Sequence, residues 1–181
     1  MKLIFLDRDG VINKDTQGYV ASCEEFEFIP GSLEAILKLN TSGYEINIIS
    51  NQAGIAKGIY SVEDLEKVNN KMMREIEKVG GKINSAQYCI HEDEDNCLCR
   101  KPATGMFKKA VKGRDVEFMK CYFIGDKISD IAAGRAIGCK TILVLSGKTK
   151  KEDVACWKIK PDYIKENLKE SVDWILRKEK K

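Results

Sequence analysis

Apolar residues along this chain fall into short unbroken runs that alternate with amphipathic stretches. The first run, residues 3–6, leads directly into Asp7 and Asp9. A run without polar alternation is typical of a strand buried on both faces, as in a parallel sheet. Similar runs predict further strands at 44–50, 86–90, 121–125 and 141–145.

Between these runs the apolar residues recur at helical spacing. The predicted helices run from 32 to near 43 and over 61–79, 104–112, 128–137 and 165–178. Ser61, with Asp64 three residues later, is typical of a helix N-cap with an acidic first turn. Because strands and helices alternate, we expect an α/β protein with a Rossmann-like, doubly wound, mainly parallel sheet. The absence of repeats and low-complexity linkers predicts a single domain, residues 1–181.

Composition and charge favour a cytoplasmic globular protein. Lys and Arg total 31 against 28 Asp and Glu, and the two signs are interspersed, which is typical of a solvated surface and argues against a nucleic-acid partner. No apolar run is long enough to cross a bilayer, and the N-terminus lacks the pattern of a signal peptide. Seven cysteines without an export signal do not indicate a disulfide framework.

Polar side chains follow three of the predicted strands. Asp7 and Asp9 follow the first strand, Ser50 and Asn51 close the second, and Asp126 follows the fourth. Open α/β sheets place their ligands at the carboxyl ends of the strands, so these groups are expected to converge in one crevice. Residues two apart in an extended chain point the same way, which predicts that Asp7 and Asp9 share a target while Arg8 turns aside.

This set of groups fits phosphoryl transfer. A phosphate dianion approaches several carboxylates only if a divalent cation neutralises the repulsion, and hard oxygen ligands suit Mg²⁺. One aspartate would attack phosphorus, and a second would protonate the leaving oxygen and later activate water. Ser50 and Lys101 would bind the phosphoryl oxygens. The plainer alternative is a doubly wound fold in which the acids coincide by chance.

A cysteine-rich loop follows the third predicted strand. Cys89, His91, Cys97 and Cys99 supply soft donors at C-x-H and C-x-C spacing, and His91 is the sole histidine of the chain. This donor set predicts a tetrahedral structural Zn²⁺ site, since the acidic tip between the pairs could not fold by burial alone. The alternatives are reduced surface cysteines and, less favoured, a redox pair. Zinc would fix the direction of the adjoining Arg100 and Lys101.

Taken in order, these motifs resemble those of the haloacid dehalogenase (HAD) superfamily of phosphatases. The stretch 6–13, LDRDGVIN, resembles its first motif, Ser50 its second, Lys101 its third, and Gly125-Asp126 with Asp130 its fourth. The resemblance implies that Asp7 is the nucleophile and Asp9 the general acid/base. It also implies that Asp7, Asp9 (through its backbone carbonyl) and Asp126 bind magnesium, with Asp130 one shell further out.

Within this superfamily, the cysteine loop followed by Arg100-Lys101-Pro102, together with 50–58, SNQAGIAKG, resembles a narrower group. That group is the D-glycero-D-manno-heptose 1,7-bisphosphate phosphatases, with histidinol-phosphate phosphatases as the nearest alternative. The resemblance implies a monomer with little or no cap domain that removes the C7 phosphate in surface-glycan (lipopolysaccharide) precursor synthesis. The implied substrate contacts are Asp15, Tyr19, Ser50, Asn51, Gln52, Ala53, Arg100, Lys101 and Lys127.

The sequence departs from the family pattern at two places. The stretch 15–19 carries one more residue than the family pattern, and 102–105 lacks a second proline common in the family.

An alternative of another class is a zinc-ribbon-like binding module without catalysis. That module would require a basic, aromatic surface, yet the tip of the cysteine loop is acidic and has no aromatic residue. Gly147-Lys148-Thr149 resembles the end of a P-loop, but Ile142 stands where that motif requires glycine.

Overall fold

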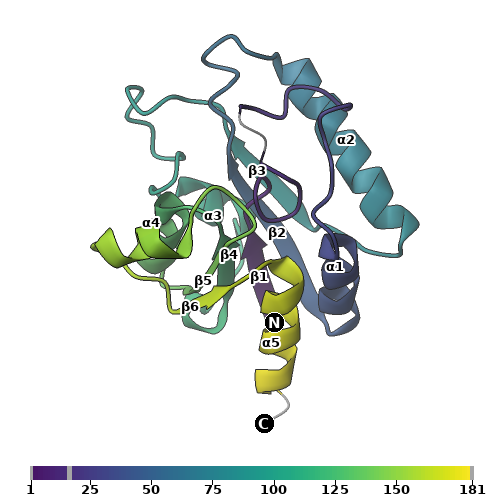
Figure 1. The fold of residues 1–181 in the computed structure, drawn as a ribbon, viewed down its shortest axis with the longest axis vertical. Helices are drawn as coiled ribbons and strands as arrows, with labels where there is room; N and C mark the ends of the chain where they lie inside the picture. Colours follow the sequence, from purple (N-terminus) through teal and green to yellow (C-terminus); the bar gives the residue numbers. More distant parts are fainter. Residues whose placement is uncertain (1, 16–17, 180–181) are drawn as a thin grey trace.

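The computed structural model describes residues 2–15 and 18–179. Over these residues, one six-stranded sheet has the order β3-β2-β1-β4-β5-β6, and every neighbouring pair is parallel (Figure 1). The strands are β1 (Lys2–Leu6), β2 (Tyr44–Asn51), β3 (Ser85–Cys89), β4 (Tyr122–Gly125), β5 (Lys140–Val144) and β6 (Tyr163–Lys165). The α-helices are α1 (Ser32–Thr41), α2 (Val62–Lys78), α3 (Gly105–Ala110), α4 (Ile128–Ile137) and α5 (Leu168–Glu179), with 3₁₀ helices η1 (Phe118–Lys120) and η2 (Lys151–Cys156).

The sheet is covered by helices on both faces, so the strands read as continuous apolar runs. On β1, Ile4 and Leu6 belong to a core cluster that includes buried residues of α1, α2 and α5. Leu3 and Phe5 face the other way, into a cluster with residues of α3 and α4. Figure 1 shows the same division, with α1, α2 and α5 on one side of the sheet. The predicted α/β class with a doubly wound parallel sheet is confirmed.

The observed elements differ from the prediction mainly near the C-terminus. The predicted last helix began at residue 165, but Lys165 ends β6, which pairs with β5, and α5 begins at Leu168. The strand was missed because its three residues are too few to show a period. Ser61 caps α2 as expected, since its hydroxyl accepts the Asp64 N–H and the Asp64 carboxylate accepts the Ser61 N–H.

The order of the strands determines where a ligand can bind. The chain leaves β1 for β2 on one side and later returns to β4 on the other, so β1 lies at the point where the strand order reverses. Loops at the carboxyl ends of β1, β2 and β4 therefore diverge around a crevice. Of the unusually long stretch 15–19, residues 16 and 17 lie outside the described residues. None of the described helices is long and apolar enough to cross a membrane.

Candidate active site

A cavity of about 360 Å³ opens at the carboxyl ends of β1, β2 and β4. Most of the residues predicted to form the site line it, and they come from loops far apart in the sequence. The lining comprises Asp7, Asp9, Gly18, Tyr19, Ser50, Asn51, Ala53, Arg100, Lys101, Lys127, Ser129, Asp130 and Lys148. The structure thus brings together groups that follow separate strands, as expected for residues at the carboxyl ends of a parallel sheet.

Asp7 lies at the floor of this cavity beside a buried lysine. The Nζ atom of Lys101 is 3.1 Å from Asp7 Oδ1 and 2.6 Å from Asp130 Oδ1, and it donates to the Ile49 carbonyl oxygen at 2.9 Å. The side chains of Lys101 and Asp130 are each 1% exposed. Three oxygen partners in a fixed arrangement therefore hold the ammonium next to the Asp7 carboxylate.

Asp126 is fully buried directly after β4. Its Oδ2 accepts the backbone N–H of Lys148 at 3.2 Å, while its Oδ1 has no hydrogen-bond partner among the described residues. A Cβ on Gly10 or Gly147 would lie 2.7 or 2.1 Å from the Asp126 side chain. Both positions therefore require glycine for steric reasons, and the Asp126 carboxylate is wedged between two loops.

The acids crowd one another closely enough to perturb their titration. Carboxylate oxygens of Asp7, Asp126 and Asp130 lie within 4.8 Å of one another. Burial raises the pKa of Asp7, and the negative charges of Asp130 and Asp9 add to the rise against the opposing charges of Lys101 and Lys127. Burial likewise raises the pKa of Asp126 to about 8. Crowded, buried carboxylates with an unpartnered oxygen are the donor set that a hard divalent cation such as Mg²⁺ fits.

Asp130 differs from Asp126 because protein groups contact both of its carboxylate oxygens. Its Oδ2 accepts the backbone N–H groups of Asp126 and Lys127 at 3.0 and 2.9 Å, and its Oδ1 pairs with Lys101. These contacts fit a brace behind a metal site better than a direct ligand, as the sequence suggested.

Arg8, a residue for which the sequence predicted no function, binds the carboxylate of Asp9. Arg8 Nε and Nη2 donate to the two carboxylate oxygens of Asp9, each at 3.0 Å, and Asn13 and Gln52 add donors at 2.9 and 2.8 Å. Burial would raise the pKa of Asp9, but these partners outweigh it and lower the pKa. Arg8 itself is fully buried, with its guanidinium 5.9 Å from the Tyr88 ring.

Arg8 was missed because β1 ends at Leu6, so the alternation of an extended strand no longer applies at residue 8. Its side chain turns away from the cavity, as expected, but it bends back to bind the Asp9 carboxylate from the protein interior. A signal was present in the sequence, since a charged residue between two acids at the end of a buried strand needs a partner nearby.

Residues at the end of β2 and just after it support the site in different ways. Ser50 is 1% exposed and its Oγ accepts from Gln52 Nε2 at 3.1 Å. The Asn51 side chain binds the main chain of Lys101 twice, accepting from its N–H at 3.0 Å and donating to its carbonyl at 3.1 Å. Gln52 does not line the cavity, because its amide is occupied by Asp9, Ser50, Arg8 and the Tyr60 hydroxyl.

The predicted substrate contacts gather at the cavity mouth. Tyr19, Ala53, Arg100 and Lys127 line it, whereas Asp15 lies behind it with its side chain 6% exposed. Asp15 forms ion pairs with Lys127 at 3.0 Å and with Lys148 at 3.2 Å. Lys148 was not among the predicted site residues, because the Gly147-Lys148-Thr149 sequence has no P-loop glycine before it and its contact with Asp15 joins segments far apart in the chain.

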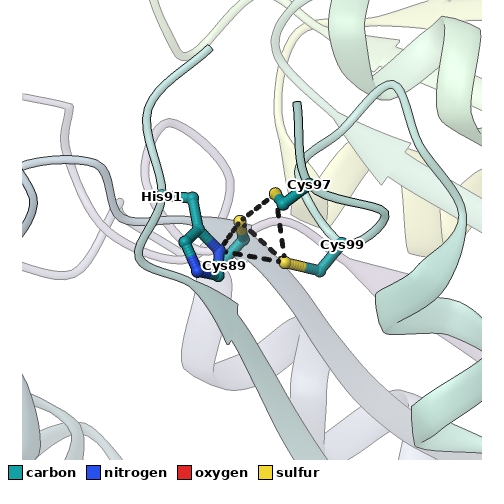
Figure 2. Close-up of side chains that lie close together, drawn as sticks. All are labelled: Cys89, His91, Cys97 and Cys99. Atoms are coloured by element: carbon teal, nitrogen blue, oxygen red, sulfur yellow. Dashed lines mark hydrogen bonds between the residues drawn. The ribbon is translucent and has the colours of Figure 1, made fainter. Parts of the chain in front are cut away.

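The four predicted zinc ligands converge in the loop after β3 (Figure 2). Cys99 Sγ lies 3.1 Å from Cys89 Sγ, 3.3 Å from Cys97 Sγ and 3.3 Å from His91 Nδ1, and Cys89 Sγ lies 3.6 Å from both Cys97 Sγ and His91 Nδ1. Ligands of a tetrahedral Zn²⁺ with bonds of about 2.3 Å to sulfur and about 2.0 Å to nitrogen would be about 3.5–3.8 Å apart. The donor set therefore fits zinc, and the four donors converge on one point with some separations shorter than those of a zinc-bound site.

This cysteine cluster is connected to the cavity through Arg100. The Arg100 backbone N–H donates to Cys97 Sγ at 3.4 Å, and its guanidinium donates to Asp93 Oδ1 at 2.6 Å and to the His91 carbonyl at 3.1 Å. Burial opposes ionisation of Cys97, but this N–H and neighbouring donors lower the pKa of its thiol to about 6. A thiolate is the form that binds a metal.

Comparison with known proteins agrees with this geometry. A family model described as HAD-hydrolase-like matches residues 98–171. A D-glycero-beta-D-manno-heptose-1,7-bisphosphate 7-phosphatase of Neisseria meningitidis is 40% identical over 151 residues, covering 83% of this chain and 81% of the relative. The Helicobacter pylori protein of the same name is 36% identical over 178 residues, covering 96% of this chain and 97% of the relative.

A solved structure shows the same likeness in three dimensions. The D,D-heptose 1,7-bisphosphate phosphatase from B. bronchiseptica, crystallised with magnesium and phosphate, superposes with a TM-score of 0.92 at 33% identity. The match covers 98% of this chain and 99% of that one.

Proposed function

Since this chain belongs to the HAD-like family of D-glycero-beta-D-manno-heptose-1,7-bisphosphate 7-phosphatases, we propose that it removes the C7 phosphate of D-glycero-D-manno-heptose 1,7-bisphosphate. The observation that carries the proposal is the arrangement of Asp7, which is buried beside Lys101 and close to Asp126 in a cavity that Asp9 also lines. The names of the relatives favour the β anomer and favour the heptose bisphosphate over histidinol phosphate.

The reaction proceeds in two displacements at phosphorus. A carboxylate oxygen of Asp7 attacks the C7 phosphate, and the bond from phosphorus to the sugar oxygen breaks. Asp9 gives that oxygen a proton, which it must first take up because its partners lower its pKa in the free protein. Asp9 then takes a proton from water, which attacks the aspartyl phosphate and releases inorganic phosphate, restoring Asp7. Ser50 and Lys101 bind the phosphoryl oxygens, whose charge the transition state spreads.

Magnesium is the catalytic metal in this proposal. Asp7 and Asp126 would hold it through their carboxylates and Asp9 through its backbone carbonyl, with Asp130 bracing the set from behind. Bound Mg²⁺ supplies charge that offsets the repulsion between these acids and the incoming phosphate. Burial, and then the charges of neighbouring carboxylates, raise the pKa of Asp7 and of Asp126, and a bound divalent cation would relieve both costs.

Zinc has a structural part in the proposal and takes no direct part in hydrolysis. Cys89, His91, Cys97 and Cys99 together offer no open coordination position of the kind that a hydrolytic zinc needs. The zinc-bound loop would set the direction of Arg100, which contacts substrate together with Asp15, Tyr19, Ala53 and Lys127. The contacts assigned to Asn51 and Gln52 would use their backbone, since their side-chain amides bind other protein groups.

The remaining parts of the proposal concern the whole chain. It acts as a single catalytic domain and as a monomer, on a small molecule made in surface-glycan precursor synthesis. Exposed large apolar residues such as Leu98, Met119 and Ile59 are scattered over different segments, which supports a monomer. None of the seven cysteines forms a disulfide, which fits a reducing cytoplasm. The binding-module alternative finds no support in the relatives, which are named as phosphatases.

Phosphate release in the presence of Mg²⁺ tests the function directly. The panel contains both anomers of heptose 1,7-bisphosphate, histidinol phosphate and p-nitrophenyl phosphate, and we expect the highest kcat/KM on the β bisphosphate. Asp7→Asn should lower kcat by about a thousandfold or more, because the amide is a poor nucleophile. Higher kcat/KM on histidinol phosphate would replace the substrate assignment, and no turnover on any substrate would refute the enzyme.

A further inference from the structure

Lys148 is a cation at the cavity mouth for which the reaction described above has no use. Its backbone is fixed firmly, because its N–H donates to Asp126 Oδ2 at 3.2 Å and the neighbouring Ser146 hydroxyl donates to the Gly10 carbonyl at 2.7 Å. The close approach of Gly147 to the Asp126 side chain allows these two contacts together. The segment carrying Lys148 is thus held against the metal-binding loop at its backbone, and the side chain extends from a fixed point.

The Lys148 side chain is the most exposed of the three lysines that line the cavity. It is 50% exposed, compared with 38% for Lys127 and 1% for Lys101. Asp15 joins Lys148 to Lys127, and Lys127 Nζ lies 3.7 Å from Asp126 Oδ1. The buried Asp15 therefore links the Lys127 ammonium beside Asp126 to the more exposed Lys148 ammonium.

The proposed substrate carries two phosphates, and each must bind near a different member of this set of charged side chains. The reacting phosphate must touch Asp7, which lies 3.1 Å from the Lys101 ammonium, while the Lys127 ammonium lies 3.7 Å from Asp126. The second phosphate sits at the other end of the sugar and must point toward the mouth. A dianion there needs a cation with donors to spare.

Lys127 pairs with Asp15 and lies beside Asp126, which leaves Arg100 and Lys148 as the other cations that line the cavity near its opening. Arg100 already gives Nε to Asp93 at 2.6 Å and Nη1 to the His91 carbonyl at 3.1 Å. Among the described residues, Lys148 has one charged partner, Asp15, at 3.2 Å. An ammonium has three donors, so it can keep Asp15 and still bind a phosphate.

We propose that Lys148 binds the non-reacting phosphate of the bisphosphate and thereby selects bisphosphates over monophosphates. Asp15 orients the ammonium toward the mouth, and the Lys148 N–H, bound to Asp126, ties this second anion site to the metal site. This inference rests on the proposed phosphatase function and deepens it.

The test compares two substrates that share the reacting group. We would measure kcat and KM for heptose 1,7-bisphosphate and heptose 7-phosphate with the wild type, Lys148→Met, Lys148→Arg and Lys151→Met. Lys151 is an exposed lysine of the same segment that does not line the cavity, so its variant controls for net charge. The ability of the product, heptose 1-phosphate, to inhibit competitively gives a readout that does not depend on turnover.

Loss of one charge-assisted phosphate contact should lower the bisphosphate-to-monophosphate ratio of kcat/KM by about 10- to 100-fold in Lys148→Met, mainly through KM. The inhibition constant of heptose 1-phosphate should rise by a similar factor, Lys148→Arg should recover part of both, and Lys151→Met should match the wild type. An equal loss on both substrates, or an unchanged ratio, would refute the role of Lys148. Absence of wild-type turnover on both substrates would instead refute the phosphatase function.

Discussion

Lys101 and Asp130 form a fully buried ion pair in which Nζ lies 2.6 Å from Oδ1. The other oxygen of Asp130 accepts the backbone N–H groups that precede α4. Burial would lower the pKa of Lys101, but Asp130 and Asp7 outweigh it and raise the pKa, so the lysine is charged at neutral pH. One carboxylate therefore fixes both the proposed phosphoryl-binding cation and the loop that carries Asp126.

Removing the lysine should expose the cost of this buried pair. Lys101→Met leaves two buried carboxylates without their cation, so we expect a loss of about 3–5 kcal/mol in the free energy of unfolding. The double variant Lys101→Met/Asp130→Asn should be less destabilised than the single one. Urea unfolding measures both, with Lys120→Met as the control. That lysine pairs with Glu117 on the surface, each 72% exposed, and its loss should cost about 1 kcal/mol or less.

Asp126 gives a prediction about pH. Its pKa is raised from 3.8 to about 8 in the folded chain, so the folded state binds this proton more tightly than the unfolded state does. The contribution to stability is complete below about pH 4 and is lost as the pH rises through about 8. In EDTA, the melting temperature of Asp126→Asn should therefore exceed that of the wild type by a margin that grows from about pH 5 to about pH 9.

Magnesium should reverse this order of stability. At pH about 8, added Mg²⁺ should raise the melting temperature of the wild type, while Asp126→Asn should gain little and should have lost most of its activity. Differential scanning fluorimetry with and without Mg²⁺ provides both curves. A difference between the two proteins that does not change with pH would contradict the assignment of the burial cost to Asp126.

Arg8 should matter for catalysis although it does not line the cavity. Arg8→Lys keeps the charge but loses the two parallel bonds to Asp9, so we expect kcat to fall by about tenfold or more while KM changes little. Asn69→Ala removes only a 3.3 Å contact to Arg8 and should change kcat far less. Steady-state kinetics on the bisphosphate decides the matter, and wild-type kcat in Arg8→Lys would show that Asp9 does not depend on this clamp.

Zinc should determine the structure of the cysteine loop and, through it, substrate affinity. Elemental analysis should find about one zinc per chain, and a strong chelator or Cys99→Ser should lower the melting temperature and raise KM. Cys156→Ser is the control, because Cys156 is exposed and lies outside the cluster. If zinc removal leaves both the melting temperature and KM unchanged, the loop does not position Arg100.

The sequence predicted the parts of this molecule that depend on local pattern. Apolar runs such as 3–6 and 44–50 predicted buried strands. Because parallel strands end at the same edge of a sheet, Asp7 and Asp126 were expected to lie close together, and they do. The spacing of the cysteines likewise predicted that Cys89 and Cys99 lie close together in a folded loop.

What escaped prediction depends on side chains that meet across the fold. The clamp of Arg8 on Asp9 includes Gln52, which is distant in sequence, and no periodicity reports such a contact. The position of Lys148 depends on glycine contacts between the loops after β1 and β5. β6 is stabilised by its pairing with β5 and has too few residues to leave a pattern.

The two glycines that flank Asp126 also limit how this enzyme can be redesigned. Because Gly10 and Gly147 leave no room for a Cβ, the chain around them can be neither substituted nor lengthened without moving the acid between them. Residues after Lys148 are free of that constraint, and the exposed 3₁₀ segment η2 follows at once. Loop grafting meant to change substrate range should therefore start beyond Lys148, where new sequence can be added while the catalytic machinery keeps its shape.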